Sequence, residues 1–397
     1  MQNKDPLPLA GLTVVAIEQA VAAPLATRHL ADWGARVIKI ERPGTGDFAR
    51  GYDMRVKGLS SYFVWLNRSK ESLTLDLKRP EANEVVAKLI AGADILVHNL
   101  APGAMDRLGF GNAAMRARHP RLIICAVSGY GSTGPYRDRK AYDLLVQSEA
   151  GLLSITGTPE APAKAGISVA DIAAGMYAYS AILTALVRRS TTGDGAAIEV
   201  SMLDALGEWM SHPFYATTYG GSPLPRSGAR HAAIAPYGPF SAGDGKTVYL
   251  GIQNEREWIR FCGDVLSQPT LANDARFINN TLRVENREAL ETAINTVFAT
   301  LTTLEIVARL DAADIAQARL NTVAEFAAHP QLAARNRWRE IDSPAGPLRA
   351  LAPPVMMDAL EPAMGAVPAL GAHTDAILET LGYDHATIIG WRKAGII

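Results

Sequence analysis

Asp171 is the residue of this sequence whose type and position point most directly to chemistry. It stands at the start of an apolar run, Ile172 to Val187, whose spacing is typical of a buried helix. A carboxylate at a helix N-terminus faces unpaired backbone N–H groups, which favour its charged form and can also stabilise an oxyanion. On local grounds Asp171 is an N-cap or a nucleophile that the helix keeps ionised, and the cap is the commoner role. Ala174 does not complete a capping box, which weakens the cap slightly.

A second pattern, Gly129 to Gly134, matches the glycine spacing of a dinucleotide-binding loop after an expected strand. Pro135 and the charged run 137–140 follow it in place of an apolar helix, and the first strand-to-helix turn, 19–23, contains no glycine. The sequence around the glycine pattern therefore argues against a dinucleotide-binding site. Only Cys125 and Cys262 occur, too few for a disulfide framework or a zinc site, so we expect no metal and no tightly bound cofactor.

Alternating strands and helices must position these residues in the first half of the chain. The periodicity predicts strands over residues 12–18, 36–40, 73–77, 94–98, 122–128 and 197–201, and helices over residues 25–33, 81–91, 142–156 and 171–189. Strand, helix and strand joined by short turns form βαβ units. This half is therefore predicted to be an α/β domain with a parallel sheet and helices on its faces.

The second half has a different pattern. A Gly- and Pro-rich stretch, 220–239, precedes an expected strand over 247–251 and helices over 255–265 and 288–310. A Pro-rich stretch, 343–362, then leads to an amphipathic helix near 374–381. Two long connections imply that the chain leaves the first domain and returns. We predict a large α/β domain over residues 1–205 and 365–397, a linker over 206–235, a small α+β domain over 236–325 and a return linker over 326–364.

Bulk composition agrees with two domains and sets limits on partners. The chain has 397 residues, more than one hydrophobic core usually supports. Its formal net charge is -1, without a block of like charge, so we expect no nucleic-acid or membrane surface. The longest charge-free apolar run is shorter than a membrane span, and the first residues do not have the pattern of a secretory signal. A cytoplasmic location is therefore expected.

Six blocks of the sequence cover residues 9–15, 34–47, 67–78, 99–109, 170–175 and 370–374. In these blocks, and in their order, the chain resembles the class III CoA-transferases, the family that includes formyl-CoA:oxalate CoA-transferase and the acyl-CoA racemases. The resemblance implies a large Rossmann-like domain with a parallel sheet formed from both chain ends, a small middle domain, and an interlocked homodimer. It also implies that a coenzyme A thioester is a co-substrate and that Asp171 matches the family's nucleophilic aspartate.

The resemblance also implies a set of CoA contacts, carried over position by position. These contacts fall on Ala20, Val21, Ala22, Arg42, Leu75, Lys78, Asn99, Leu100, Arg107, Lys140 and Tyr142. The diphosphate and the 3′-phosphate of CoA call for basic groups, and the four basic residues of this set are plausible phosphate ligands. Each of them taken alone is more often a solvated surface charge.

Two departures from the family pattern bear on the acceptor acid. Val21 stands where the oxalate-using member has a glutamine, which argues against oxalate. No run of glycines longer than Gly220-Gly221 is present to form the family's glycine-rich lid. We expect a different acceptor, in which Arg226, Arg230 and His231 hold a distal carboxylate, as a dicarboxylate such as succinate, mesaconate, itaconate or citramalate would offer. The alternative, that these three residues belong to a hydrated linker, is equally open.

The sequence thus predicts a CoA-transferase that moves CoA from a donor such as succinyl-CoA to a C4–C5 dicarboxylate through aspartyl anhydride and aspartyl-CoA thioester intermediates. The runner-up is a 2-methylacyl-CoA racemase. By resemblance the racemases use a histidine where this chain has Tyr142, beside the matching Asp143, and a tyrosine is a poor base near neutral pH. A non-catalytic CoA-binding protein is the third interpretation.

Overall fold

The computed structural model describes residues 5–397, and the chain divides into two compact units. Unit 1 comprises the residues up to Ala150, Ala165–Ser211 and Gln331–Ile397. Unit 2 comprises Gly151–Lys164 and His212–Pro330. Each unit has its own hydrophobic core.

A six-stranded parallel sheet forms the centre of unit 1, in the order β3-β2-β1-β4-β5-β6. Its strands are β1 (Thr13–Ile17), β2 (Arg36–Glu41), β3 (Lys70–Thr74), β4 (Ile95–His98), β5 (Ile123–Ser128) and β6 (Ala197–Ser201). The central strands are buried on both faces, as their unbroken β-branched and aliphatic runs predict. The predicted α/β class is confirmed.

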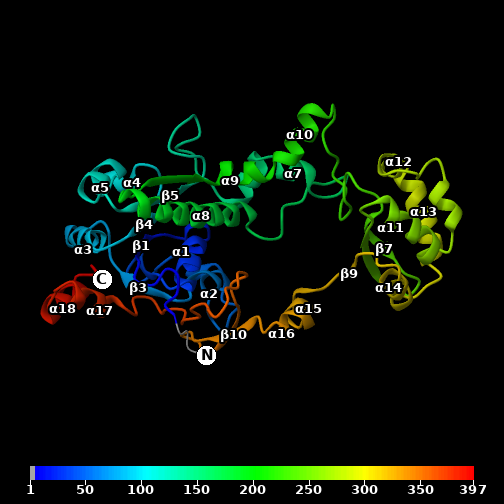
Figure 1. Cartoon of the computed structure of the whole chain (residues 1–397). Coiled ribbons are helices and arrows are strands. Elements are labelled where there is room, and N and C mark those ends of the chain that lie inside the picture. Colours follow the sequence, from blue (N-terminus) through cyan, green and yellow to red (C-terminus); the bar gives the residue numbers. More distant parts are fainter. Residues whose placement is uncertain (1–4) are drawn as a thin grey trace. The chain divides into compact units, whose positions relative to one another are not determined.

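Helices cover both faces of this sheet. One face packs on α3 (Pro80–Ala91), α5 (Asn112–Arg118), α17 (Thr374–Thr380) and α18 (His385–Lys393) through a shared aliphatic core. The other face carries α1 (Ala22–Asp32) and α8 (Val169–Thr192), which lie side by side in Figure 1. The remaining helices of unit 1 are η1 (Phe48–Gly51), α2 (Ser61–Asn67), α4 (Ala104–Arg107), α6 (Asp143–Glu149), α9 (Met202–Trp209) and, at the boundary with unit 2, α16 (Pro330–Ala334).

The third strand lies three residues earlier than the predicted 73–77. β3 begins at Lys70, whose ammonium group is buried and donates to Glu18 Oε1 at 2.7 Å. Leu75 and Leu77 follow the strand and pack on the core shared with α3. The sequence analysis began this strand at Leu73, after the charged residues, whereas the ion pair of Lys70 supplies the pairing that allows a charged residue inside the sheet.

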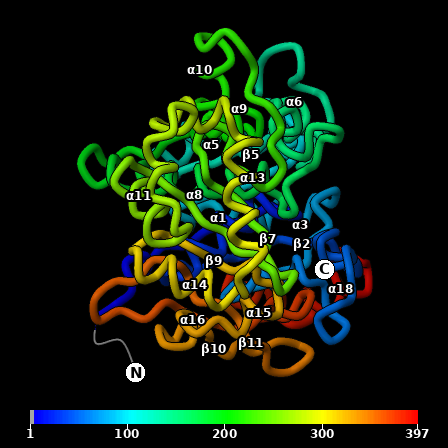
Figure 2. The backbone as a smooth tube through the Cα atoms, turned by 90° about the vertical axis from the view of Figure 1, so that its right-hand side faces the viewer, coloured from blue at the N-terminus to red at the C-terminus, as the bar shows by residue number. Residues whose placement is uncertain are grey.

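Every strand of the parallel sheet comes from residues 13–201, so the expectation that both chain ends contribute to this sheet is wrong. The residues after 330 add α17 and α18 to unit 1, and Figure 2 shows the red C-terminal segment beside the blue N-terminal half. Residues 338–351 also form the antiparallel hairpin of β10 (Trp338–Ile341) and β11 (Leu348–Leu351). Ile341 and Leu348 are buried against Phe63, so this part of the expected return linker packs on the domain.

Two predicted helices are each divided by a local signal. Residues 142–156 form α6 and α7 (Leu152–Ile155), which are separated at Gly151, whose φ is +81°. Residues 288–310 form α13 (Arg287–Phe298) and α14 (Thr303–Ala312), and α14 starts at a Thr302–Glu305 capping box. A left-handed glycine and a capping box each end one helix and begin another.

Unit 2 contains a three-stranded antiparallel sheet in the order β7-β8-β9 with helices packed on it, which agrees with an α+β class. Its strands are β7 (Tyr237–Ser241), β8 (Thr247–Gly251) and β9 (Gln317–Arg319). Its other elements are α10 (Ser211–Tyr219), α11 (Glu255–Arg260), η2 (Phe261–Val265), η3 (Pro269–Asn273), α12 (Asn280–Glu285) and α15 (Val323–Ala327).

The helix α8 is longer than the predicted 171–189 and bears directly on the site. Judged by length and composition alone, it is the single helix of the described residues apolar enough to cross a membrane, or one of two if the bent pair of α13 and α14 is counted as one. Core helices of soluble proteins pass the same test. α8 packs on α1, β5 and β6.

Candidate functional site

β1 and β4 are paired up to their last residues, Ile17 and His98, but the chain continues from β1 toward β2 and from β4 toward β5, on opposite sides of this pair. In open parallel sheets such a switch point leaves a crevice in which ligands bind. The turn after β1 contains Ala20, a non-glycine residue with a left-handed φ of +64°. The segment after β4 begins with Asn99, whose side chain bonds both the backbone N–H and the backbone carbonyl of Gln19.

A cavity of about 630 Å³ lies at this edge and is lined entirely by unit 1. Of the residues predicted from the sequence to form the site, it brings together Ala20, Ala22, Asn99, Leu100, Lys140, Tyr142 and Asp171. Phe48, Tyr52 and Tyr62 add an aromatic wall that the sequence analysis did not identify. The sequence carried a weak signal for them, because they lie between two blocks that resemble the family.

Asp171 occupies the third position of α8, after the N-cap Ser168. The alternative reading of Asp171 as the N-cap is therefore wrong, since the helix begins two residues earlier, at Val169. Within residues 5–397 its carboxylate accepts no hydrogen bond and forms no ion pair, although it is half-buried in the cavity wall. A carboxylate left without partners at a cavity is available to a substrate.

Gly175, one turn after Asp171, sets how closely α8 approaches α1. A Cβ atom at this position would lie 2.6 Å from the carbonyl oxygen of Ala22 and 3.0 Å from Cβ of Leu25. Only a residue without a side chain fits this contact. The close approach brings the first turn of α8 beside the Ala20–Ala22 turn, so the nucleophile candidate and the switch-point loop line one cavity.

Burial raises the pKa of Asp171 to about 7, and the negative charge of Asp143 adds to the rise. The expectation that the helix N-terminus keeps Asp171 ionised is therefore wrong near pH 7. The cavity removes water from the carboxylate and holds a second carboxylate nearby, and both effects disfavour the charged form. Near pH 7 about half of the Asp171 side chains carry a charge, and the ionised form is poorly solvated and hence a better nucleophile.

Asp143 and Gln147 of α6 hold the segment that leads into Asp171. Asp143 Oδ1 accepts the N–H of Ala170 at 2.9 Å, and Asp143 Oδ2 accepts Nε2 of Gln147 at 2.7 Å. Gln147, which is fully buried, accepts the N–H of Ala165 at 3.0 Å. The sequence analysis noted Asp143 only through the racemases and missed Gln147, because their partners lie 18 to 27 residues away along the chain.

Tyr142, the N-cap of α6, stands in the Asp171 cavity with an exposed ring. The loop before it folds back on the sheet edge at Gly129. A Cβ at Gly129 would lie 2.1 Å from Cβ of Ala141, so the glycine is needed for this close packing. The glycine pattern 129–134 thus serves the return of the loop and leads into no helix.

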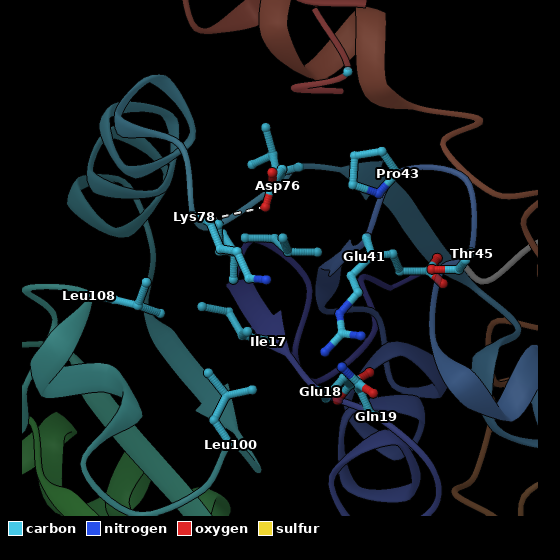
Figure 3. Close-up of a pocket in the computed structure, with 15 residues that line it drawn as sticks. Ile17, Glu18, Gln19, Glu41, Pro43, Thr45, Asp76, Lys78, Leu100 and Leu108 are labelled. Carbon is cyan, nitrogen blue, oxygen red and sulfur yellow. Dashed lines mark hydrogen bonds between the residues drawn. The ribbon is translucent and has the colours of Figure 1, made fainter.

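A second cavity, of about 440 Å³, opens beside the first at the ends of β2 and β3 (Figure 3). Arg42, Leu75, Lys78 and Leu100 line it, and Leu100 is shared with the Asp171 cavity. Asp76 connects its rim to the end of the chain. The N–H of Asp76 donates to the carbonyl of Ile396 at 2.8 Å, and Asp76 Oδ1 accepts the N–H of Lys78 at 3.1 Å.

The four basic residues expected to bind phosphate are exposed. Among residues 5–397 no carboxylate lies within ion-pair distance of Arg42, Lys78, Arg107 or Lys140. Arg42 and Lys78 line the second cavity, and Lys140 lines the Asp171 cavity. Arg107 lines neither cavity. Unpaired cations beside a cavity suit an anionic ligand.

Val21 also lies outside both cavities. It is buried in an apolar cluster with Leu25 and Leu66, against which Ile172 packs. Its side chain therefore supports the contact between α1, α2 and α8. The expectation that excludes oxalate placed this side chain near the reacting group, whereas in the structure it lies in the apolar cluster.

Arg226, Arg230 and His231 belong to unit 2, where each has a local partner. Arg226 donates to the carbonyls of Thr158 and Pro159, both at 2.8 Å. Arg230 pairs with Glu291 at 2.7 Å. His231 accepts the N–H of Ala233 and stacks on Tyr237. Within unit 2 these contacts are structural, and the role of the three residues in holding a substrate stays a prediction.

No group of three or more His, Cys, Asp or Glu side chains that could hold a metal occurs in the described part of the chain. His98 at the end of β4 lines neither of these two cavities, and burial lowers its pKa to about 4. Cys125 and Cys262 are buried thiols. The reactive groups of this edge are therefore carboxylates, tyrosines and basic side chains.

Known proteins resemble this chain over most of its length. The human succinyl-CoA:glutarate CoA-transferase is 32% identical over 98% of this chain and 90% of its own length. The acetyl-CoA:oxalate CoA-transferase of Acetobacter aceti is 37% identical over 83% of this chain and 85% of its own. A solved CAIB/BAIF family protein from Brucella suis has 32% identity and a TM-score of 0.82, covering 96% of this chain and 100% of its own. Residues 9–374 match the CoA-transferase family III, and the chain belongs to this family of enzymes.

Proposed function

We propose that this enzyme transfers CoA from succinyl-CoA to a C4–C5 dicarboxylic acid, with Asp171 as the covalent nucleophile. One observation carries the proposal: the Asp171 carboxylate lines the switch-point cavity without a hydrogen-bond partner among residues 5–397. The family uses CoA thioesters, and the resemblance matches Asp171 to the family's nucleophilic aspartate.

The two cavities suit the two ends of a CoA thioester. The cavity beside Arg42 and Lys78 offers cations for the phosphates, together with the apolar surface of Leu75, Leu100 and Leu108. The Asp171 cavity receives the thioester end of the same molecule, because the two cavities share Leu100. Lys140 lies on the wall of the Asp171 cavity and adds another cation.

The first half of the reaction converts the donor thioester into an enzyme thioester. An Asp171 oxygen attacks the donor carbonyl carbon, the carbon–sulfur bond breaks, and CoA thiolate leaves a mixed anhydride behind. The thiolate then attacks Cγ of Asp171 and expels the donor as its carboxylate. The product is an aspartyl-CoA thioester, so the energy of the thioester bond is conserved.

The second half runs in reverse with the acceptor acid. An acceptor carboxylate attacks Cγ of Asp171 and expels CoA thiolate, which forms the second mixed anhydride. The thiolate attacks the acceptor carbonyl carbon and releases Asp171 as a carboxylate. The aromatic wall of Phe48, Tyr52 and Tyr62 limits the access of water, which would hydrolyse either anhydride.

A dicarboxylate acceptor is favoured by the human relative, which is named for succinyl-CoA and glutarate. The relative from Acetobacter aceti is named for oxalate. The test incubates the protein with succinyl-CoA and with glutarate, itaconate, mesaconate, citramalate and oxalate in separate reactions, and detects new thioesters by mass spectrometry. We expect the C5 acids to give the highest kcat/KM. Transfer to oxalate alone would contradict the proposed acceptor class.

The alternative function for the same cavity is that of a 2-methylacyl-CoA racemase. Tyr142 occupies the position where the racemases have a histidine, and a tyrosine is a weak base near neutral pH. One stereoisomer of a 2-methylacyl-CoA is incubated in deuterated water without an acceptor acid. We expect no deuterium at C2, whereas exchange faster than the background rate would favour the racemase.

A homodimer of interlocked subunits and a cytoplasmic location belong to the same proposal. Both rest on the family resemblance and on the sequence pattern. Sedimentation equilibrium of the purified protein tests the first, and a mass near 42.4 kDa, that of one chain, would contradict it.

A further inference from the structure

The side chain of Asn99 is committed to the backbone of one residue. Its Nδ2 group donates to the carbonyl oxygen of Gln19 at 2.7 Å, and its Oδ1 atom accepts the N–H of Gln19 at 2.9 Å. Only one orientation of the amide satisfies both contacts. The pair joins the segment after β4 to the turn after β1, across the point where the strand order reverses.

This contact holds a strained residue in place. Ala20 follows Gln19 and has a φ of +64°, a backbone conformation that residues other than glycine and asparagine adopt rarely. Ala20 lines the cavity that contains Asp171. A strained backbone persists where its surroundings over-determine it, and such positions cluster at functional sites.

The carboxylate of Asp47 is a second support of this turn. Asp47 Oδ1 accepts the N–H of Ala20 at 3.0 Å and the N–H of Ala49 at 2.9 Å. Asp47 Oδ2 accepts Nζ of Lys39 at 2.8 Å, and both residues are buried. The same carboxylate therefore fixes the Ala20 turn and the start of η1, whose Phe48 forms part of the aromatic wall.

We propose that Asn99 is a positioning residue: it acts through Gln19 to hold the Ala20 turn against Asp171, and does not bind CoA through its side chain. This inference rests on the proposed function, and it revises the CoA-contact role that the family resemblance implies for Asn99. Each of the two polar atoms of the amide is already bonded to Gln19 in the absence of ligand. Only the second N–H of Nδ2 and the second lone pair of Oδ1 are not engaged by Gln19, so the backbone of Gln19 sets the orientation of the amide.

If Asn99 is a positioning residue, its substitution should lower kcat and leave the affinity for CoA nearly unchanged. Asn99→Ala removes both bonds to Gln19, so Ala20 loses one of the two supports of its left-handed conformation. We expect kcat to fall by about tenfold or more, because misplacing a wall of the reacting site by a fraction of an ångström has effects of that order. The dissociation constant of CoA, measured by calorimetry, should change by less than about threefold, because no group that contacts CoA is lost.

A second substitution links the effect to the backbone of Ala20. Glycine adopts a φ of +64° without steric cost, so Ala20→Gly in the Asn99→Ala background should recover part of the lost kcat. The same double variant should also regain part of the urea midpoint that Asn99→Ala loses, which reports on the turn independently of activity. Asn295→Ala, on the exposed surface of α13, is the matched control and should equal the wild type.

Each result bears on a separate claim. A wild-type enzyme that transfers CoA to no acid contradicts the proposed function, whereas the urea midpoints still decide whether Asn99 supports Ala20. With an active wild type, the positioning role is overturned if Asn99→Ala weakens CoA binding as much as it lowers kcat/KM at unchanged kcat. It is also overturned if Ala20→Gly recovers neither kcat nor the urea midpoint.

Discussion

Asp143 accepts the N–H of Ala170, the residue before Asp171, through a hydrogen bond of 2.9 Å. One carboxylate thus anchors the first turn of the helix that carries another, and its charge adds to the effect of burial on the pKa of Asp171. An asparagine at position 143 removes the charge and keeps an oxygen that can accept the N–H of Ala170, although its amide nitrogen gives up the bond from Nε2 of Gln147.

The pH dependence of the donor reaction should report this charge. The nucleophile must be ionised, so kcat/KM for the acyl-CoA donor is expected to rise with pH and to reach half of its maximum near pH 7. In Asp143→Asn the midpoint should move to lower pH, since a like charge has been removed. Initial rates between pH 5 and 9 measure it. An unchanged midpoint would mean that Asp143 acts only through its hydrogen bonds.

Folding stability should show the same raised pKa with a defined sign. A carboxyl group whose pKa is higher in the folded state than in the unfolded state costs stability when it ionises, so its cost is absent below about pH 4 and fully present above about pH 7. Asp171→Asn should therefore raise the free energy of unfolding at pH 8 and leave it unchanged at pH 4. The upper limit is about 4 kcal/mol, at roughly 1.4 kcal/mol per pKa unit, and solvent at the half-buried site reduces it.

Chemistry and binding should separate in Asp171→Asn. The variant is expected to lose transfer activity entirely while its dissociation constant for CoA stays near that of the wild type, because Asp171 bonds none of the residues predicted to hold CoA. Hydroxylamine treatment of the wild type during turnover should label Asp171, as mass spectrometry of peptides can detect. A variant that still turns over would exclude the covalent mechanism.

The contact between Gly175 and Ala22 predicts a loss of activity from a single methyl group. A Cβ at Gly175 would lie 2.6 Å from the Ala22 carbonyl oxygen, so α8 must shift and carry Asp171 with it. We expect Gly175→Ala to lower kcat by roughly a hundredfold, in line with the effect of a displacement near 1 Å.

Gly207→Ala is the control for Gly175→Ala. Gly207 lies within α9, and a Cβ there would have no atom within 4 Å. Because alanine favours a helix over glycine by about 1 kcal/mol, this variant should be as active as the wild type and slightly more stable. Equal activity of the two variants would contradict the packing argument.

Phosphate recognition can be tested with two CoA ligands. Lys78→Ala and Arg42→Ala should each weaken CoA binding by about tenfold, the order of one charge-assisted contact, and binding should weaken further as salt is raised. The titration is then repeated with 3′-dephospho-CoA, which lacks the 3′-phosphate. If Lys78 or Arg42 contacts that phosphate, the corresponding alanine variant should bind 3′-dephospho-CoA as tightly as the wild type does. Arg116→Ala, exposed on α5, serves as the control.

The sequence by itself determined the α/β class, most of the strands, and Asp171 as the residue to examine. These follow from local patterns: the β-branched runs of β1 and β5, the helical spacing after Asp171, and motif blocks that keep the family order. Local patterns report what a residue and its neighbours prefer along the chain. The raised pKa of Asp171, in contrast, depends on burial and on Asp143, 28 positions away in the sequence.

Only the tertiary structure decided how this site is held together. The start of β3 at Lys70 depends on a buried bond to Glu18, 52 residues away, and the turn at Ala20 depends on Asn99 and Asp47. A polar residue that serves a distant backbone group carries no local signature, because its partner is chosen by the fold. The family resemblance implied that Asn99 contacts the ligand, whereas the structure bonds its side chain to the backbone of Gln19.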